Sequence, residues 1–199
     1  MNIHVPTSQF NRTTRAAEGL PRWRWTTAEL DHLVGLGVFR ADEQFELIGG
    51  EIVPMLPAGR PHEVMKEDLA EYLHSLAPKD VKVRTEQQLN LDASTYTKPD
   101  VLVRRAGTKS YDVDGTTVLL VVEIAESSLD YDTNTKARLY ALFGVREYWV
   151  IDTKTRSTRV HRKPAAGGYS DVFEVSSEEL VTPMLIPAMT VKMSDVDAD

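Results

Sequence analysis

Three segments of the chain place apolar residues at every third or fourth position, the spacing of a buried helix face. The first helix is predicted over 27–37, behind a T-x-x-E capping box at 26–29. The second begins at Pro61, which suits a first helical turn, and runs to residue 77. The third covers 131–143 and stops at Gly144. Their apolar stripes are Leu30, Leu33 and Val34; Val64, Met65, Leu69, Tyr72, Leu73 and Leu76; and Ala137, Tyr140 and Ala141.

Shorter apolar runs between these segments predict β-strands. Two runs around Gly49-Gly50 predict a hairpin over 45–53. The run VLLVVEI at 118–124 is almost entirely apolar, which predicts a strand covered on both faces. With the helices, these strands predict an α/β or α+β fold, in which helices flank a central mixed β-sheet. Strands are predicted over 81–91, 101–103, 117–124 and 145–151, with further short strands after a turn at 153–155.

The length of 199 residues suits one domain with a single core. Residues 1–22 are polar and show no periodicity, which predicts a flexible N-terminal tail. We therefore expect a single domain over 23–192 and an acidic C-terminal tail over 193–199.

Composition narrows the classes of function. The chain has no run of about 18 apolar residues, and its first twenty lack the apolar segment of a secretory signal. We therefore expect a cytoplasmic protein with no membrane partner. The absence of cysteine excludes disulfides and thiolate metal sites but leaves sites with oxygen ligands. The net charge of −7 argues against a general nucleic-acid coat protein, yet allows an enzyme with a locally basic groove.

Two acidic residues interrupt apolar strands. The stretch TKPDVLV at 97–103 carries Pro99-Asp100 into a strand, although proline belongs at a strand start, an edge or a bulge. Glu123 lies late in the most apolar strand, where a carboxylate needs a partner, a metal ion or a shifted pKa. If the two strands are adjacent, both carboxylates converge and offer the oxygen ligands that Mg²⁺ or Mn²⁺ prefers. The alternative is that Asp100 caps a turn and Glu123 lies at a solvated strand end.

Lys136 is the third candidate. It follows the Glu123 strand on the predicted helix 131–143, beside the inward-facing Ala137. From there it could reach the carboxylates and, beside a metal ion, orient water or neutralise charge on a phosphate. The alternative is an ordinary surface pair, since Asp132 and Lys136 stand at i and i+4 in the favourable order.

The order of these residues, Pro99-Asp100, then Glu123, then a helical lysine, resembles the PD-(D/E)xK nuclease superfamily. More specifically, the chain resembles the Uma-two family of restriction endonucleases from about residue 22 to 190. The block at 121–152 is the most specific, because its Glu, Tyr-Asp, Lys, Tyr, Gly-Val, Glu-Tyr-Trp and Ile-Asp follow the family order without gaps. The four matching blocks are FELIGGEIVPM (45–55) followed by His62, KPDVLV (98–103), VVEIAESSLDYDTNTKARLYALFGVREYWVID (121–152) and GGYS (167–170).

The resemblance implies a restriction-endonuclease-like core and a set of site residues. Asp100 and Glu123 would bind the divalent metal ion, and Glu46 would be an additional acidic residue. Ala125 stands where the superfamily usually has its lysine; the family pattern moves that lysine to the next helix, at Lys136. As alternatives, Glu46 could pair with a lysine across the hairpin, His62 could cap the helix that follows it, and Tyr140 could pack in the core. The implied supporting residues are His62, Asp132 and Tyr140.

The implied activity is hydrolysis of DNA phosphodiesters with Mg²⁺ or Mn²⁺, in which the ion and Lys136 activate water. Lys98, Arg104 and Arg105 flank the Asp100 strand and are candidates to neutralise DNA phosphates, or else solvated surface charges. Members of the superfamily often work as dimers because a duplex needs two cuts, so a homodimer is expected.

Other classes of function stay open. A catalytically silent nucleic-acid-binding or regulatory protein on the same fold would bind DNA without cleaving it. A protein whose acidic surface contacts a basic partner would lack the steep salt dependence of DNA binding. A glycosidase could use Asp100 and Glu123 as acid and base, but the chain lacks an obvious aromatic sugar platform and nothing then explains Lys136.

Overall fold

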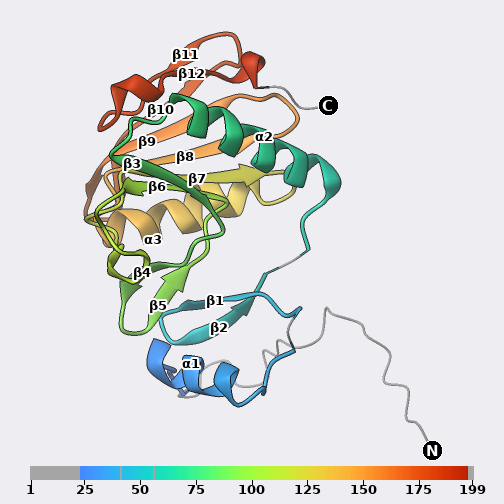
Figure 1. Cartoon of the computed structure of the whole chain (residues 1–199), viewed down its shortest axis with the longest axis vertical. Helices are drawn as coiled ribbons and strands as arrows, with labels where there is room; N and C mark the ends of the chain where they lie inside the picture. Colours follow the sequence, from blue (N-terminus) through green and yellow to red (C-terminus); the bar gives the residue numbers. More distant parts are fainter. Residues whose placement is uncertain (1–22, 41, 56, 197–199) are drawn as a thin grey trace, which may run out of the picture.

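Helices and three β-sheets make up the part of the chain that the computed structural model describes, residues 23–40, 42–55 and 57–196. The N-terminal tail predicted over 1–22 lies outside these described residues. Figure 1 shows the largest sheet in the upper part of the molecule and a smaller sheet below it. The predicted fold class is confirmed, since helices flank a central mixed sheet.

The central sheet has six strands, and one of them is buried along its whole length. In spatial order they are β10 (Gly168–Val175), β9 (Thr158–Ala165), β8 (Glu147–Asp152), β7 (Leu120–Ala125), β6 (Val101–Arg105) and β3 (Val81–Thr85). Only β7 and β8 run parallel; the other neighbouring pairs are antiparallel. Alternate residues of β7 enter different core clusters, Val122 on one face and Val121 on the other. The prediction of a strand covered on both faces is therefore confirmed.

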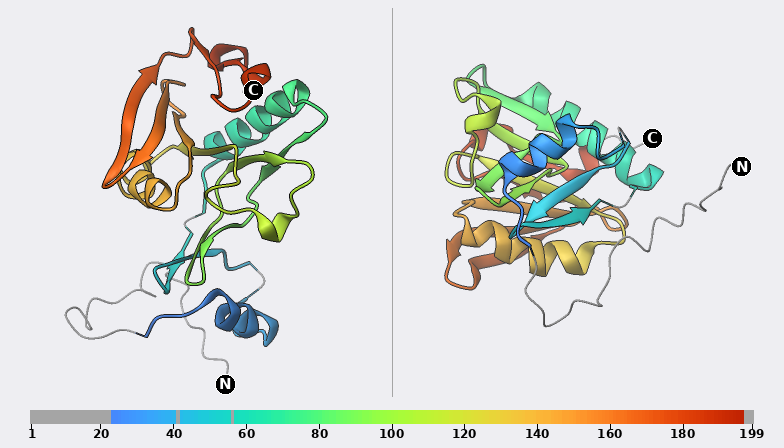
Figure 2. Two further views of the ribbon diagram at one scale, coloured as in Figure 1. Left: turned by 90° about the vertical axis from the view of Figure 1, so that its left-hand side faces the viewer. Right: turned by 90° about the horizontal axis from the view of Figure 1, so that it is seen from below.

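Two helices cover the opposite faces of this sheet, as Figure 2 shows. α2 (Arg60–Leu76) buries Met65, Leu69 and Leu73 against one face. α3 (Ala137–Leu142) buries Tyr140 against the other and is followed by Gly144, whose φ is 78°. Both helices present the apolar stripes predicted from their spacing.

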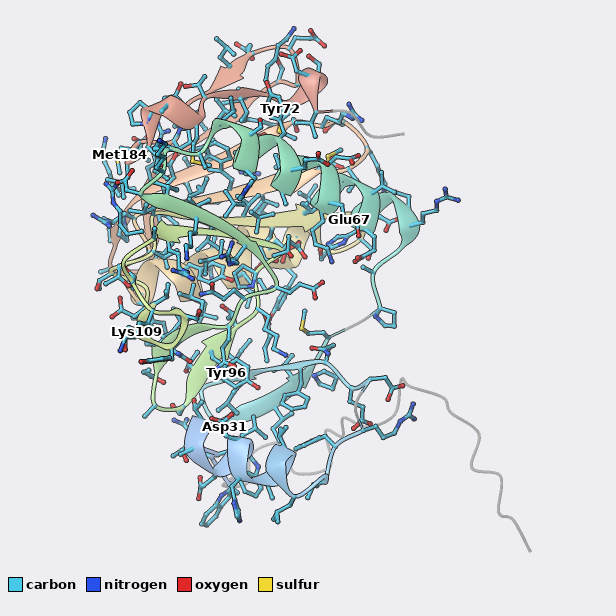
Figure 3. The ribbon with its side chains drawn as sticks, viewed as in Figure 1. Asp31, Glu67, Tyr72, Tyr96, Lys109 and Met184 are labelled. Atoms are coloured by element: carbon cyan, nitrogen blue, oxygen red, sulfur yellow. The ribbon has the colours of Figure 1, made fainter. Side chains whose placement is uncertain are left out.

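The smaller sheet joins the N-terminal hairpin to a second hairpin from the middle of the chain. The N-terminal hairpin turns at Gly49-Gly50, whose φ values of 59° and 82° lie in the left-handed region that favours glycine. Tyr96, labelled in Figure 3, pairs with Leu47 across the two hairpins, and both side chains are buried. In spatial order the strands are β2 (Glu51–Pro54), β1 (Phe45–Ile48), β5 (Thr95–Thr97) and β4 (Leu89–Asp92).

Helix α1 (Thr27–Gly35) covers the smaller sheet and starts with the predicted capping box. The Thr26 hydroxyl accepts a hydrogen bond from the Glu29 backbone N–H, and the Glu29 carboxylate accepts one from the Thr26 N–H. Leu30 is fully buried in the small core of this module. The helix ends earlier than predicted, because Gly37 takes a φ of 70° and its N–H closes the last turn.

Two predicted elements are divided in the structure. The prediction of one continuous strand over 81–91 is wrong, because β3 belongs to the central sheet and β4 to the smaller one. Glu86 lies between them with a φ of 50°, a left-handed conformation that interrupts a strand. The helix predicted over 131–143 combines a π-helical segment, Tyr131–Lys136, with α3. The three-residue strand β5 was not predicted at all.

The C-terminal segment packs on the sheet face that carries α2. Its strands β11 (Leu180–Val181) and β12 (Val191–Lys192) form a two-stranded sheet. Within the expected acidic tail, Met193–Asp195 forms a 3-10 turn, and Met193 and Val196 are each 1% exposed. The packed fold therefore extends through residue 196. In the described ranges, no helix combines the length and the apolarity needed to cross a bilayer.

Candidate active site

Strands β6 and β7 bring the two predicted carboxylates to one end of the central sheet. Their antiparallel pairing includes Val101 with Val122, so Asp100 and Glu123 are the next residues on each strand. Because side chains alternate, both carboxylates lie on the sheet face that α3 covers. Asp100 is 8% and Glu123 is 4% exposed. The alternative of a solvated strand end is therefore wrong for Glu123.

Asp100, at the start of β6, forms hydrogen bonds with residues of β7 and α2. Its Oδ2 accepts a hydrogen bond of 2.7 Å from the Ile124 backbone N–H and lies 3.1 Å from Nε2 of His62. Pro99 fits immediately before the strand because it has no N–H to leave unpaired. Its carbonyl accepts a hydrogen bond from the Glu86 N–H. The Pro-Asp pair thus begins the strand and directs a carboxylate toward β7.

Glu123 accepts two hydrogen bonds inside the protein. Its Oε1 lies 2.9 Å from Nζ of Lys136 and 2.9 Å from the hydroxyl of Tyr140. The same hydroxyl lies 3.1 Å from Oγ1 of Thr97. The lysine and the tyrosine come from consecutive turns of one helical segment, which explains how both reach the same oxygen.

Glu46 enters the cluster from the smaller sheet. Its Oε1 lies 3.4 Å from Nζ of Lys136 and accepts a hydrogen bond of 3.0 Å from the Lys98 backbone N–H. The alternative of a pair with a lysine across its own hairpin is wrong, because both contacts come from other parts of the chain. The cluster therefore lies where the two sheets meet.

The π-helical turn directs Asp132 and Lys136 into the protein. Asp132 is 3% and Lys136 is 8% exposed, so the alternative of a surface pair is wrong. Oδ2 of Asp132 accepts a hydrogen bond of 2.5 Å from the Ser128 hydroxyl, and its carbonyl accepts one of 3.1 Å from Tyr148. Single π-helical turns are rare in proteins, and a large share of those that do occur lie at functional sites.

Carboxyl groups outnumber cationic groups in this cluster. Burial raises the pKa of Glu123 well above its ordinary value, and the ammonium of Lys136 offsets this only in part. The like charges of Asp100, Asp132 and Glu46 raise it further. Burial alone would lower the pKa of Lys136, but the surrounding carboxylates outweigh it and raise that pKa. Three carboxyl groups, those of Glu123, Glu46 and Asp132, therefore face one lysine, which remains an ammonium, while Asp100 pairs with His62.

A neighbouring group on α2 supports the Asp100 side of the cluster. Burial disfavours the charged form of His62, but the hydrogen bond and charge of Asp100 outweigh it, so its pKa is raised above 6.5. One turn later, Lys66 is 5% exposed and pairs with Glu63 at 2.7 Å and with Glu86. Sequence reasoning missed Lys66. Its position four residues after His62, next to the apolar stripe, was the available signal.

The three predicted phosphate-binding residues do not gather at the cluster. Lys98 contributes its backbone there, but its ammonium hydrogen-bonds to Gln44 at 2.9 Å. Arg104 is 4% exposed and donates to Gln87 and to backbone carbonyls of the following turn. Arg105 lies at the other end of β6 and pairs with an exposed aspartate. Of the three, only Lys98 lies beside the carboxylates.

The carboxylates suit a hard divalent cation. Asp100 and Glu123 offer oxygen ligands, and the repulsion among neighbouring carboxyl groups that raises the pKa of Glu123 favours a bound cation. Within the described ranges, no group of three or more His, Asp or Glu side chains is arranged to hold a metal ion. Mg²⁺ does not require one, because it keeps several waters and often binds one or two carboxylates together with substrate phosphates. The residues present therefore fit Mg²⁺ held jointly by protein and substrate.

Comparisons with known proteins identify the family and the fold of this chain. The model of the Uma2 family, described as "Putative restriction endonuclease", matches residues 27–194 and so includes every residue of the cluster. A crystal structure of "a putative nuclease belonging to DUF820 from Anabaena variabilis ATCC 29413" is similar, with a TM-score of 0.61 and 18% identity. The match covers 81% of this chain and 94% of that chain. At this identity the likeness shows the fold alone. No curated protein matches the chain.

Proposed function

Because this chain belongs to the Uma2 family of restriction-endonuclease-like proteins, we propose that it is an endonuclease that hydrolyses DNA phosphodiesters with Mg²⁺ or Mn²⁺. The family supports the substrate class. The carboxylate–lysine cluster at the end of β6 and β7 supports the reaction chemistry.

The observation that carries the proposal is the unbalanced charge of this cluster. Elsewhere the fold balances a buried acid: Glu147, 0% exposed, lies 2.7 Å from the guanidinium of Arg162 and accepts further hydrogen bonds. At the cluster, the carboxyl groups of Glu123, Glu46 and Asp132 share one lysine. Burying uncompensated charge is unfavourable, so such an excess is typical of a functional site rather than of a structural one.

Each residue of the cluster has a role that follows from its contacts. A bound Mg²⁺ would supply a Lewis acid and a water of lowered pKa, with Asp100 and Glu123 as its protein ligands. Tyr140 orients the Glu123 carboxylate through its hydroxyl. His62 orients Asp100.

Lys136 acts as a cation in this proposal. Its pKa is raised by the surrounding carboxylates, so the side chain carries a proton at neutral pH and is not a general base. An ammonium in this position donates hydrogen bonds to phosphate oxygens and stabilises the negative charge that develops on the scissile group.

Calorimetric titration of Mg²⁺ and Mn²⁺ tests the metal ligands. We expect wild type to bind one ion, and Asp100→Asn and Glu123→Gln to bind it at least about tenfold more weakly. Asp80→Asn is the matched control, because it removes an exposed carboxylate at the far end of β6. The titrations are repeated with a phosphorothioate oligonucleotide present, so that a site completed by a phosphate is also detected.

Plasmid cleavage in Mg²⁺ tests the reaction itself. Wild type and the Asp80→Asn control should cleave, and the two site variants should not. Cleavage by Asp100→Asn at the wild-type rate would overturn the assignment. Salt-dependent DNA binding by wild type without any cleavage would instead identify a catalytically silent member of the fold.

A further inference from the structure

A cavity lies between the helical segment after β7 and the hairpin of β9 and β10. It has a volume of about 290 Å³. Figure 2 shows the helix and the hairpin side by side. Its polar lining comes from Thr133, Asn134 and Arg138 on the helix and from Arg159, His161 and Tyr169 on the hairpin. None of the residues assigned to the carboxylate cluster lines it.

The lining of this cavity is positively charged. It contains two arginines and no aspartate or glutamate. Both arginines are exposed, and within the described part of the chain neither guanidinium has an ion-pair or hydrogen-bond partner. Glu174, the cross-strand neighbour of Arg159, instead accepts a hydrogen bond from Ser157. Two unpaired guanidinium groups in one cavity stand out in a chain whose net charge is −7.

His161 is a buried polar residue in the wall of the cavity. The residue is 3% exposed, and its Nε2 has no hydrogen-bond partner among the described residues. Burial lowers its pKa to about 4, and the charge of Arg159 contributes, so the ring is neutral at neutral pH. Buried polar atoms are almost always hydrogen-bonded, so a buried ring nitrogen without a partner lies directly behind the cavity surface.

The GGYS sequence at 167–170 shapes the open side of the cavity. Gly167 and Gly168 have φ values of 92° and 148°, and a Cβ at either would meet nothing within 4 Å. The hydroxyl of Tyr169 donates a hydrogen bond of 2.8 Å to the Val145 carbonyl, which fixes the hairpin beside the helix. The turn is therefore held in place while its outer side stays open.

We propose that this cavity binds a phosphate group of a nucleotide, with Arg138 and Arg159 donating to the phosphate oxygens. Paired guanidinium groups match the planar, bidentate recognition of phosphate oxygens. The volume lies at the low end of the range for ligand sites, which suits one nucleotide unit. The nucleotide is either free or part of a DNA strand, and only the second source rests on the proposed nuclease function.

Binding assays in EDTA test this site without cleavage. The probes are dAMP and a single-stranded DNA octanucleotide, each titrated into the full chain by calorimetry. The test variant is Arg138→Gln/Arg159→Gln. The control is Lys79→Gln/Lys154→Gln, which removes two exposed positive charges outside the cavity. We expect the test variant to bind at least about tenfold more weakly and the control to bind like wild type.

A readout on wild type removes any dependence on the folding of the variants. The NMR signals of the His161 ring should shift on titration with the probe that binds, while those of the exposed His74 should not. Binding of both probes identifies a nucleotide site, and binding of the octanucleotide alone identifies a DNA-strand site. No binding by wild type, equal affinity of the test and control variants, or an unshifted His161 would each overturn the proposal. These binding assays do not depend on cleavage, so their outcome is independent of the plasmid cleavage test with Asp100→Asn. The nucleotide site and the nuclease function can therefore be refuted separately.

Discussion

Lys136→Met removes the single ammonium of the carboxylate cluster while keeping a side chain of similar length. In the wild type, Nζ lies 2.9 Å from Glu123 and 3.4 Å from Glu46. At an effective dielectric constant of about 20, these contacts correspond to gross attractions of about 6 and about 5 kcal/mol. Desolvation offsets most of this. Breaking a buried pair by removing one partner reduces the free energy of unfolding by about 3–5 kcal/mol, and we expect that loss here.

Lys66→Met is the matched control. Lys66 is also a buried lysine with two carboxylate partners, but the side chains of Glu63 and Glu86 are 42% and 54% exposed. Water can solvate these carboxylates once the lysine is gone, so the expected loss is about 1 kcal/mol. Urea unfolding of both variants in EDTA, followed by tryptophan fluorescence at pH 7 and pH 5, measures the difference.

The pH dependence distinguishes lost charge compensation from lost packing. The pKa of Glu123 is raised in the folded protein above its ordinary value of 4.5. Its contribution to stability is therefore present below pH 4.5 and lost as the pH rises through the folded pKa. Without Lys136 that pKa rises further, so Lys136→Met should recover stability at pH 5 relative to pH 7. Equal losses in the two variants, or no recovery at pH 5, would refute an excess of buried negative charge at this site.

Three further substitutions, one of them with a matched control, test other contacts in the protein. His62→Gln should abolish a fall in the free energy of unfolding as the pH rises above 6.5, because the raised pKa of His62 makes its contribution present below pH 6.5 and lost above the folded value. Gly115→Ala should destabilise by about 1–3 kcal/mol in thermal unfolding, since the new Cβ would lie 2.2 Å from a backbone carbonyl oxygen. Gly107→Ala, with nothing within 4 Å, should not. Arg162→Met should reduce the free energy of unfolding by about 3–5 kcal/mol in urea, because it leaves the buried Glu147 without its cation.

Local sequence patterns were sufficient to predict those features whose cause lies within a few neighbouring residues. The capping box at Thr26 and the Gly49-Gly50 turn formed as predicted, because each depends on residues only a few positions apart. The stripe of α2 also matched, since helical spacing alone selects the side that avoids water. The family resemblance indicated the fold class in advance, and the comparisons confirmed it.

The candidate site shows what local sequence patterns could not predict, namely which distant residues come into contact. Spacing along the chain left Asp100 and Glu123 as either a pair or two unrelated carboxylates, and it left Lys136 as a surface residue or a buried one. The pairing of β6 with β7 decided the first question, and the π-helical turn decided the second. Arg104 looked available for phosphate, but its donors are used inside the fold.

The sequence by itself therefore determined the helices, most of the strands, the family and the residue types available for metal-dependent hydrolysis. Tertiary structure decided that residues 81–91 serve two different sheets, that Glu46 reaches Lys136 from the smaller one, and that Lys66 is buried. The physical reason is that periodicity records which side of an element avoids water. It does not record which other element covers that side, and charge compensation depends on that neighbour.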